Sequence, residues 1–374
     1  NNYSEIPWFF KNPQIHLYQW QQNIKKFLIS IEKNIEFLES EISQNDLLKE
    51  TQARLKNLHQ AERHNSQELL KILSPFVEQA EVESPVLREL LIDHIPATQH
   101  LNSYFQTLFR DWAWNQNNEN QQALDLTLSL IPDKTSRLVV LGTGASRLTY
   151  DLHLTKTPDL TLGVDINPLL LLVAQSVIRH KSIALYELSP SPIDIDQVAV
   201  LQKLKSKSGD SEKLCFLFAD ALNLPLQAKS VDCILTPWFI DIIPQDLKLF
   251  ARRLNHSLQT GGVWANMGPL GYSNTFSRQS YRKDELEKIL EDTGFRAEVS
   301  EVHNMDYLVS PNSSQARREK VLCFRAVKIK DAKQPPYYNT LPSWVLNAEE
   351  SIPHTPWVEH TQIKSKTHFE LLSC

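Results

Sequence analysis

The chain has 374 residues, 41% of them hydrophobic, which is enough for one large domain or two moderate ones. Its 39 basic and 44 acidic side chains give a formal net charge of −5, which argues against nucleic acid as the main partner. Because the apolar runs are too short to span a membrane and no secretory signal is visible, we expect a cytoplasmic protein with no membrane partner.

The first 130 residues or so have a helical pattern. Apolar side chains recur every three or four positions at Ile24, Phe27, Leu28, Ile31, Ile35, Leu38 and Ile42. Such a stripe forms one face of a helix and needs a partner surface. We therefore predict that residues 1–100 form an N-terminal helical region packed on the main domain. The alternative is a coiled-coil contact that makes a homodimer through these helices.

The period changes after residue 136. Short apolar runs suited to buried parallel strands occur at residues 137–142, 160–165, 214–220, 231–237 and 263–268. Helical stretches, such as those at residues 168–180 and 244–258, separate some of these runs. Strands that alternate with helices predict an α/β fold with a doubly wound parallel sheet.

The predicted sheet ends differently from a repeated strand–helix pattern. After a helix at residues 283–295, two β-rich segments at 296–305 and 320–329 follow with no helix between them, so they should pair antiparallel. A parallel sheet with a terminal antiparallel strand resembles the Rossmann-like sheet of class I methyltransferases. A dinucleotide dehydrogenase would instead repeat its glycine loop. We place this domain at residues 101–330, and the Pro-rich, aromatic residues 331–374 in an extended tail without an assigned role.

The first predicted strand leads into a glycine loop. Gly142 and Gly144 suit a tight strand-to-helix turn at which the backbone approaches a ligand, and Ser146 is placed to cap the following helix. Asp165 ends the next strand, 21 residues after Gly144, where a carboxylate accepts both ribose hydroxyls of an adenosine.

Two further residues extend this pattern. Asp220 closes the third strand, where it is expected to accept the adenine amino group while Ala221 offers a backbone N–H. The loop lacks the lysine that a triphosphate requires, which favours a phosphate-free adenosine cofactor, S-adenosyl-L-methionine. Arg110 and Arg147 are candidates to bind its carboxylate, and structural ion pairs are the alternative for both.

Five segments carry a resemblance to a known family. They are FRDWAW, VLGTGASRLTYDL, VDCILTPWFID, GGVWANMGPLGY and KVLCFRAV. Through them the chain resembles the carnosine N-methyltransferase-like family of S-adenosylmethionine-dependent enzymes over about residues 104–330. The resemblance implies an N-terminal helical region, a methyltransferase domain and transfer to an imidazole nitrogen of a histidine dipeptide. The cofactor-binding residues that it implies are Arg110, Gly142, Gly144, Asp165, Asp220 and Ala221.

The resemblance also concerns the methyl acceptor. It implies that Asp241 faces the acceptor and that Tyr307 matches a family tyrosine. Ser273 stands where the family has a histidine that contacts the substrate. Where the family has a tyrosine cluster, this chain has Arg317, Arg318 and Glu319. The cofactor half therefore carries over well, and the imidazole substrate does not.

The residues themselves suggest roles at the acceptor. Trp238 and Phe239 follow the fourth strand and are expected to wall the pocket and face the sulfonium, with core packing as the alternative. Asp241 is expected to accept an acceptor N–H and stabilise the developing positive charge, or else to cap a helix. Asn266 and Tyr272 flank the next strand end and are candidates for substrate hydrogen bonds.

Three functions stay open at this point. The first is N-methyl transfer to an amine or imidazole nitrogen of a small molecule or peptide, with Asp241, Tyr272 and Tyr307 as catalytic residues. The second is O-methyl transfer with Tyr272 or Asp241 as base. The third is a catalytically silent cofactor-binding scaffold. Arg317 and Arg318 would favour a carboxylate-bearing acceptor if they line the pocket mouth, and otherwise belong to a solvated loop.

Cysteines and histidines indicate neither disulfides nor a metal site. The four cysteines are far apart and form no CxxC pair, which predicts reduced, buried thiols. The 12 histidines show no convincing metal-ligand spacing, so we expect no metal.

Overall fold

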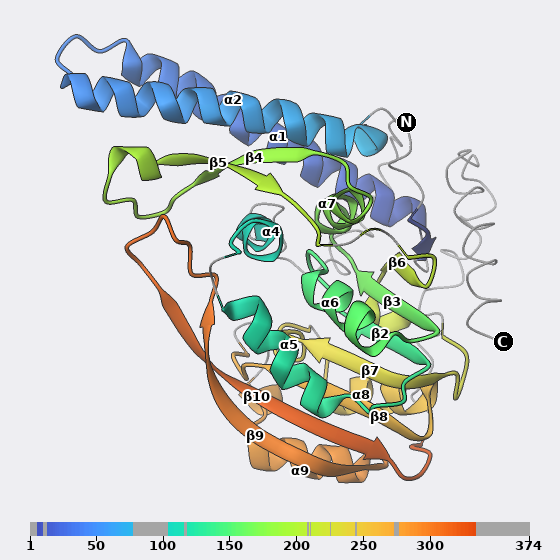
Figure 1. Cartoon of the computed structure of the whole chain (residues 1–374). Coiled ribbons are helices and arrows are strands. Elements are labelled where there is room, and N and C mark those ends of the chain that lie inside the picture. Colours follow the sequence, from blue (N-terminus) through green and yellow to red (C-terminus); the bar gives the residue numbers. More distant parts are fainter. Residues whose placement is uncertain are drawn as a thin grey trace.

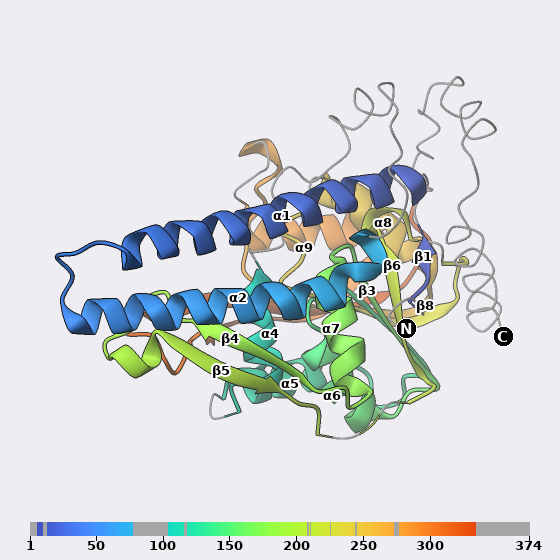
Figure 2. The same ribbon diagram turned by 90° about the horizontal axis from the view of Figure 1, so that it is seen from above.

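The computed structural model describes residues 6–9, 13–77, 104–115 and 118–333, except 208, 210, 225, 244 and 273–276. A twisted sheet with helices on both faces forms the body of the molecule, and a long helical hairpin lies across one side (Figures 1 and 2). In these ranges, no helix combines the length and apolar character that a membrane crossing requires. The predicted tail lies outside the described residues from position 334 onward.

The described part of the main sheet has eight strands in the order β1-β6-β3-β2-β7-β8-β10-β9. Neighbours pair parallel except β10, which is antiparallel to both β8 and β9. The strands are β1 (Trp8–Phe9), β2 (Arg137–Leu141), β3 (Leu160–Asp165), β6 (Leu214–Ala219), β7 (Val231–Pro237), β8 (Leu258–Gly268), β9 (Phe295–Tyr307) and β10 (Arg317–Lys328). The predicted parallel sheet with a terminal antiparallel strand is confirmed.

Burial on both faces explains why the central strands are continuous apolar runs. In β2, Leu138 and Val140 belong to one hydrophobic cluster, whereas Val139 and Leu141 belong to the cluster on the opposite face. The first face is covered by α5 (Glu119–Leu130) and α6 (Arg147–Lys156), and the second by α8 (Leu247–Ser257) and α9 (Lys283–Asp292). With helices on each face, the buried side chains of Leu138–Leu141 are apolar on both sides of the strand.

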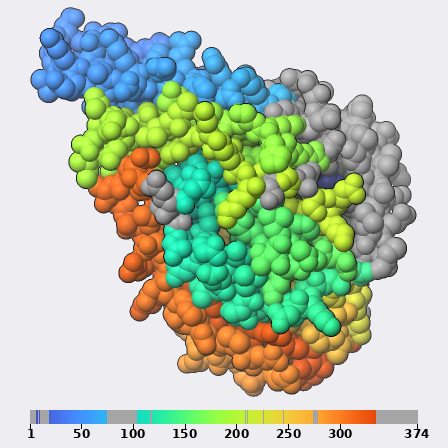
Figure 3. All heavy atoms as spheres, in the orientation of Figure 1, coloured from blue at the N-terminus to red at the C-terminus, as the bar shows by residue number. Residues whose placement is uncertain are grey.

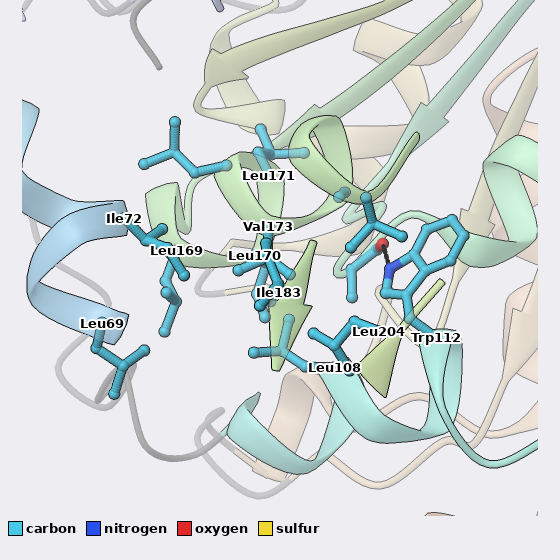
Figure 4. Packing of buried hydrophobic residues seen from close by; sticks show 14 of the residues in the cluster. Leu69, Ile72, Leu108, Trp112, Leu169, Leu170, Leu171, Val173, Ile183 and Leu204 are labelled. Atoms are coloured by element: carbon cyan, nitrogen blue, oxygen red, sulfur yellow. Dashed lines mark hydrogen bonds between the residues drawn. The ribbon is translucent and has the colours of Figure 1, made fainter. Parts of the chain in front are cut away.

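The N-terminal region forms the hairpin of α1 (Pro13–Ile42) and α2 (Lys49–Val77). The predicted stripe on α1 supplies buried residues such as Ile24 and Ile31, which join one cluster with α2 and α7 (Pro168–Ile178). Figure 4 shows the α2 end of this contact, where Leu69 and Ile72 lie near Leu169. The helices thus pack on the domain that contains the main sheet. A homodimer contact through them stays a prediction.

A two-stranded antiparallel ribbon, missed by the sequence prediction, is inserted between α7 and β6. It consists of β4 (Ile183–Leu188) and β5 (Ala199–Leu204) and is called here the β4–β5 ribbon. The ribbon lies under α2 and beside α4 (Phe105–Trp112), filling the angle between the hairpin and the body (Figures 1 and 3). Asn65 of α2 pairs with the backbone at the edge of β4. Its side-chain amide donates to Tyr186 O (2.8 Å) and accepts from Tyr186 N–H (2.7 Å).

Two isoleucines of α1 test whether the hairpin is an integral part of the fold. Ile24 is fully buried, whereas Ile29 is 50% exposed on the same helix. We expect Ile24→Ala to lower the free energy of unfolding by about 2–5 kcal/mol, since it leaves a cavity in the shared core. Ile29→Ala should change it by less than about 0.5 kcal/mol. Denaturant unfolding measures both, and equal effects would contradict the packing described here.

Candidate active site

A cavity of about 210 Å³ lies at the carboxyl ends of β2, β3, β6 and β7, where doubly wound sheets bind ligands. Residues of α4 and α5 and the end of β9 complete its wall. The structure brings together predicted residues from both halves of the site. Those that line the cavity are Arg110, Gly142, Gly144, Asp165, Asp220, Ala221, Trp238, Phe239 and Tyr307.

The two loop glycines meet different requirements. Gly142 (φ +68°) and Gly144 (φ +58°) both have a left-handed backbone conformation, which residues other than glycine rarely adopt. A Cβ on Gly142 would lie 2.4 Å from Cδ2 of Phe239, whereas a Cβ on Gly144 would meet nothing within 4 Å. Gly142 is therefore required for the fold of the loop, and Gly144 leaves open space beside the cavity.

Asp165 connects the end of β3 to the glycine loop. Its Oδ2 accepts the N–H of Gly144 at 2.7 Å, and its Oδ1 accepts the N–H of Asn167 at 2.8 Å. Burial raises the pKa of Asp165 to about 6, although these backbone N–H groups oppose the rise. The site thus holds an acidic group that changes charge just below neutral pH.

Asp220 performs a structural task at the end of β6. Its Oδ1 accepts the N–H of Leu222 (2.8 Å) and its Oδ2 accepts the amide of Asn223 (2.9 Å), which caps a short 3-10 turn. Burial raises the pKa of Asp220 as well. Each oxygen keeps acceptor capacity for a ligand that enters the cavity.

The two arginines predicted to bind a carboxylate differ in position. Arg110 lines the cavity, where its Nε donates to Asp111 (2.7 Å) and its Nη1 lies 3.5 Å from Glu119. Burial by itself lowers the pKa of Arg110, but Asp111 and Glu119 raise it above its ordinary value. Arg147 is outside the cavity wall and is held by Asp151 (2.7 Å) and the carbonyl of Asp111 (2.6 Å). These contacts agree with the alternative of a structural ion pair.

The cap predicted for α6 is also different. Ser146 is the N-cap residue, with a left-handed backbone, but its hydroxyl makes no capping hydrogen bond. Asp111 supplies the capping contact instead, since its Oδ2 accepts the N–H of Arg147 at 3.2 Å. Trp112, next to it, donates from its indole to the carbonyl of Ala145 at 2.8 Å (Figure 4). Helix α4 is thereby fixed to the glycine loop.

An aromatic wall forms the other side of the cavity. Trp238 follows β7 with a strained left-handed backbone (φ +45°), which persists only where its surroundings impose it. Its indole donates to Glu319 (3.0 Å), and its ring centroid lies 5.7 Å from that of Tyr307. Gly268 makes the close approach to Trp238 feasible, since a Cβ there would lie 2.9 Å from the tryptophan Cα.

Several predicted acceptor residues lie outside the cavity wall. Asp241 accepts the N–H of Gly271 (2.9 Å), so its carboxylate braces a loop rather than capping a helix. Asn266 accepts from Thr236 (2.9 Å) and donates to the carbonyl of Leu322 (3.0 Å) inside the sheet. Ser273 is not among the described residues.

Tyr272 also lies outside the wall. Its hydroxyl is buried and has no hydrogen-bond partner among the described residues, and burial raises its pKa. A buried phenol of this kind holds its proton and is a poor general base.

Arg317 and Arg318 do not line the cavity either. The Arg317 guanidinium lies over the Tyr307 ring, 5.1 Å from its centroid, and forms an ion pair with Glu319. Arg318 is exposed and pairs with Asp306 at 2.9 Å. A preference for a carboxylate-bearing acceptor therefore has no support from their position.

Sequence reasoning missed several residues of the wall. Tyr104 and Glu119 come from the helices before the sheet, and burial raises the pKa of both. Asn167 caps α7 through its Oδ1, and its buried Nδ2 has no partner among the described residues. The Asn-Pro pair at the start of α7 is a helix-start pattern that points to this residue. Within the part of the chain that the structure describes, no group of side chains suits a metal ion.

Comparison with known proteins identifies the family. A profile of the carnosine N-methyltransferase family matches residues 89–330. The chain belongs to this family. It is a methyltransferase, and S-adenosylmethionine is its cofactor, as the resemblance implied. A search of curated proteins found no match.

Solved structures of methyltransferases are similar at low identity. An S-adenosylmethionine-dependent enzyme from Aquifex aeolicus is 13% identical over 61% of this chain and 96% of its own, with a TM-score of 0.37. One from Methanosarcina mazei is 14% identical over 54% and 96%, with a TM-score of 0.38. Phosphoethanolamine N-methyltransferase 2 from Haemonchus contortus, solved with S-adenosylhomocysteine, is 17% identical over 56% and 53%, with a TM-score of 0.37.

The loop glycines provide a matched pair of substitutions. Gly144→Ala should lower the free energy of unfolding by about 1–2 kcal/mol, the cost of a left-handed backbone with a side chain. Gly142→Ala should lower it by about 2–4 kcal/mol, since its methyl group also overlaps Phe239. Thermal or denaturant unfolding measures both. Equal losses would show that the contact with Phe239 does not constrain the loop.

Proposed function

We propose that this methyltransferase transfers the methyl group of S-adenosylmethionine to a neutral amine or imidazole nitrogen of a small molecule or peptide. The observation that carries the proposal is the hydrogen bond between Asp165 and Gly144 beside the open space of the loop. This arrangement puts a carboxylate and a bare turn at one edge of the sheet, which suits an adenosine without phosphates.

The wall fits the cofactor. Asp165 would accept the ribose hydroxyls, and Asp220 and Ala221 would face the adenine. Asn167 supports this side of the site because its buried Nδ2 needs an acceptor, and an adenine ring nitrogen is one. Arg110 would bind the methionine carboxylate, as its planar guanidinium matches that group. When bound, the cofactor supplies an electrophilic methyl group on a sulfonium.

The acceptor side suits a nucleophile that needs no base. A neutral amine or imidazole brings its own lone pair, so the protein must mainly orient it and exclude water. Burial raises the pKa of Tyr104 and of Tyr307, so both phenols keep their protons at neutral pH and serve as hydrogen-bond donors. The Trp238 ring and the Glu119 carboxylate favour the positive charge that develops on the nitrogen.

The same features disfavour an oxygen acceptor. Transfer to a hydroxyl needs a base within reach of its proton. The bases considered for that role, Tyr272 and Asp241, lie outside the cavity wall, and burial raises the pKa of Tyr272, which keeps its phenol protonated. We therefore give these two residues no catalytic part. Tyr307 stays in the proposal as an acceptor-binding residue.

The pKa of Asp165 predicts how cofactor binding depends on pH. Its value of about 6 lies above the ordinary 3.8, so the folded protein retains the proton more strongly than the unfolded chain. The charged form therefore lowers the stability of the unliganded protein as pH rises from about 4 to 6. Ribose hydroxyls donate to that charged form, so affinity for S-adenosylhomocysteine should increase about tenfold between pH 5 and pH 7. Calorimetric titration across this range measures it.

Asp165→Asn tests the assignment. The variant should bind S-adenosylhomocysteine about 10- to 100-fold more weakly at pH 7, because hydrogen bonds to a charged group contribute about 1.5–3 kcal/mol. The pH dependence should also disappear. Asp159→Asn is the control, since that carboxylate is 74% exposed just before the same strand. An Asp165→Asn variant with native affinity would place the adenosine elsewhere.

The nature of the acceptor is tested with carnosine beside a panel of amines and phenols. The methyl group of the product, located by mass spectrometry and NMR, should lie on nitrogen. Tyr307→Phe should raise the KM for that acceptor about 2- to 12-fold, the loss of one hydrogen bond, and leave S-adenosylhomocysteine affinity within twofold. Tyr281→Phe is the control, because its hydroxyl bonds to Asp246 (3.0 Å) outside the cavity. A methylated phenol as the main product would refute N-methylation.

A further inference from the structure

A buried carboxylate that the proposed reaction does not use lies in the β4–β5 ribbon, outside the cavity wall. Glu187 of β4 is 1% exposed, and donors from several segments surround it. Trp114, just after α4, donates to its Oε2 at 3.0 Å, and Gln202 of β5 does so at 2.8 Å. The remaining donors are the hydroxyl of Ser310 and the amide of Asn312 (2.9 Å).

Ser310 and Asn312 belong to the loop between β9 and β10, called here the 308–316 loop. The loop starts next to Tyr307, which lines the cavity, and returns at Arg317, the residue paired with Tyr307 in the sheet. It also lies on the β4–β5 ribbon, since the hydroxyl of Ser189 donates to the carbonyl of Asn312 at 2.7 Å. Glu187 therefore joins the ribbon and α4 to the segment that carries an active-site tyrosine.

The first residue of the loop is strained. Leu308 has a left-handed backbone (φ +52°), a conformation that a leucine keeps only when surrounding contacts impose it. Two residues later, the hydroxyl of Ser310 donates to Glu187. The buried carboxylate of the ribbon therefore holds the strained turn that follows Tyr307.

From this geometry we propose that Glu187 is a positioning residue for the acceptor side of the active site. It fixes the 308–316 loop and, through it, Tyr307, while the cofactor side depends on the ends of β2 and β3 and on Arg110, which Asp111 holds. The proposal rests on the proposed function, because it assigns Tyr307 to the acceptor. It predicts that damage at Glu187 weakens acceptor binding and leaves cofactor binding intact.

Two substitutions of Glu187 separate its hydrogen-bonding role from its volume. Glu187→Leu is similar in size and has no acceptor, so it leaves three N–H donors and a hydroxyl without a partner. Glu187→Gln keeps an oxygen for the N–H donors, and its amide can donate to Ser310, whose hydroxyl also accepts. We expect Glu187→Leu to raise the KM for carnosine at least tenfold and to speed hydrogen exchange in residues 305–316 at least tenfold. Glu187→Gln should stay within threefold of the native protein in both.

Cofactor affinity is the readout that distinguishes positioning from general damage. S-adenosylhomocysteine should bind Glu187→Leu with a Kd within threefold of the native value, and hydrogen exchange at the glycine loop should not change. Parallel losses of cofactor and acceptor binding, or an unchanged 308–316 loop, would overturn the proposal. If the native protein methylates neither carnosine nor any amine of the panel, the proposed function fails, while hydrogen exchange still tests the link between Glu187 and Tyr307. If it methylates another amine of the panel, the KM for that amine replaces the KM for carnosine.

Milder variants serve if Glu187→Leu does not fold. Ser310→Ala and Asn312→Ala each remove one donor on the loop side and leave Trp114 and Gln202 in place. Each should raise the KM and speed exchange at residues 305–316 at least threefold. Ser314→Ala is the matched control, because its exposed hydroxyl bonds to the carbonyl of Ser191 (3.0 Å) in the ribbon and does not contact Glu187. An equal effect of Ser314→Ala would overturn a specific role for Glu187.

Discussion

The hydrogen bond from the Gly144 N–H to Asp165 determines the geometry of the cofactor side. It links the loop after β2 to the end of the adjacent parallel strand β3, since Leu141 at the end of β2 pairs with Val164 just before Asp165. The register of the two strands therefore places the Asp165 carboxylate within hydrogen-bonding distance of the loop. The left-handed backbones of Gly142 and Gly144 then turn the chain away from the cavity and into α6. Because the bond is made within the protein, the site exists before a ligand binds.

The sequence predicted well wherever local pattern and burial coincide. Strands such as β2 and β3 are buried on both faces, so their apolar runs mark them directly. Asp165 ends one such strand and Asp220 follows another, and strand ends meet at one sheet edge by topology alone. The β4–β5 ribbon has no such continuous apolar run. The backbone groups of Tyr186 at its edge bond to Asn65, more than a hundred residues earlier, and no local pattern in the ribbon predicts that contact.

The acceptor side was predicted less well for a different physical reason. A polar residue after a strand is a candidate for ligand binding only if nothing else in the protein satisfies it. Asp241 is satisfied by Gly271, Asn266 by Thr236 and Leu322, and Arg147 by Asp111 and Asp151. Most of these partners are distant in sequence, so the pattern around each residue cannot reveal them. Tyr104 and Glu119 were missed for the converse reason, because helices before the sheet hold them against the cavity.

These two halves of the cavity are built on different principles. The proposed cofactor half is positioned by the ends of parallel strands, and a change of side chain hardly moves these strand ends. The acceptor half uses Trp238 in a strained turn, Tyr307 at the end of β9, and loops tied to an inserted ribbon. Insertions in such loops leave the sheet register intact, so the acceptor pocket can be remodelled while the methyl donor stays in place. The resemblance described above implies this division as well, since it matches the predicted cofactor residues and departs from the family at Ser273 and Arg317. Its substrate preference is therefore to be sought in the loop and ribbon rather than in the glycine turn.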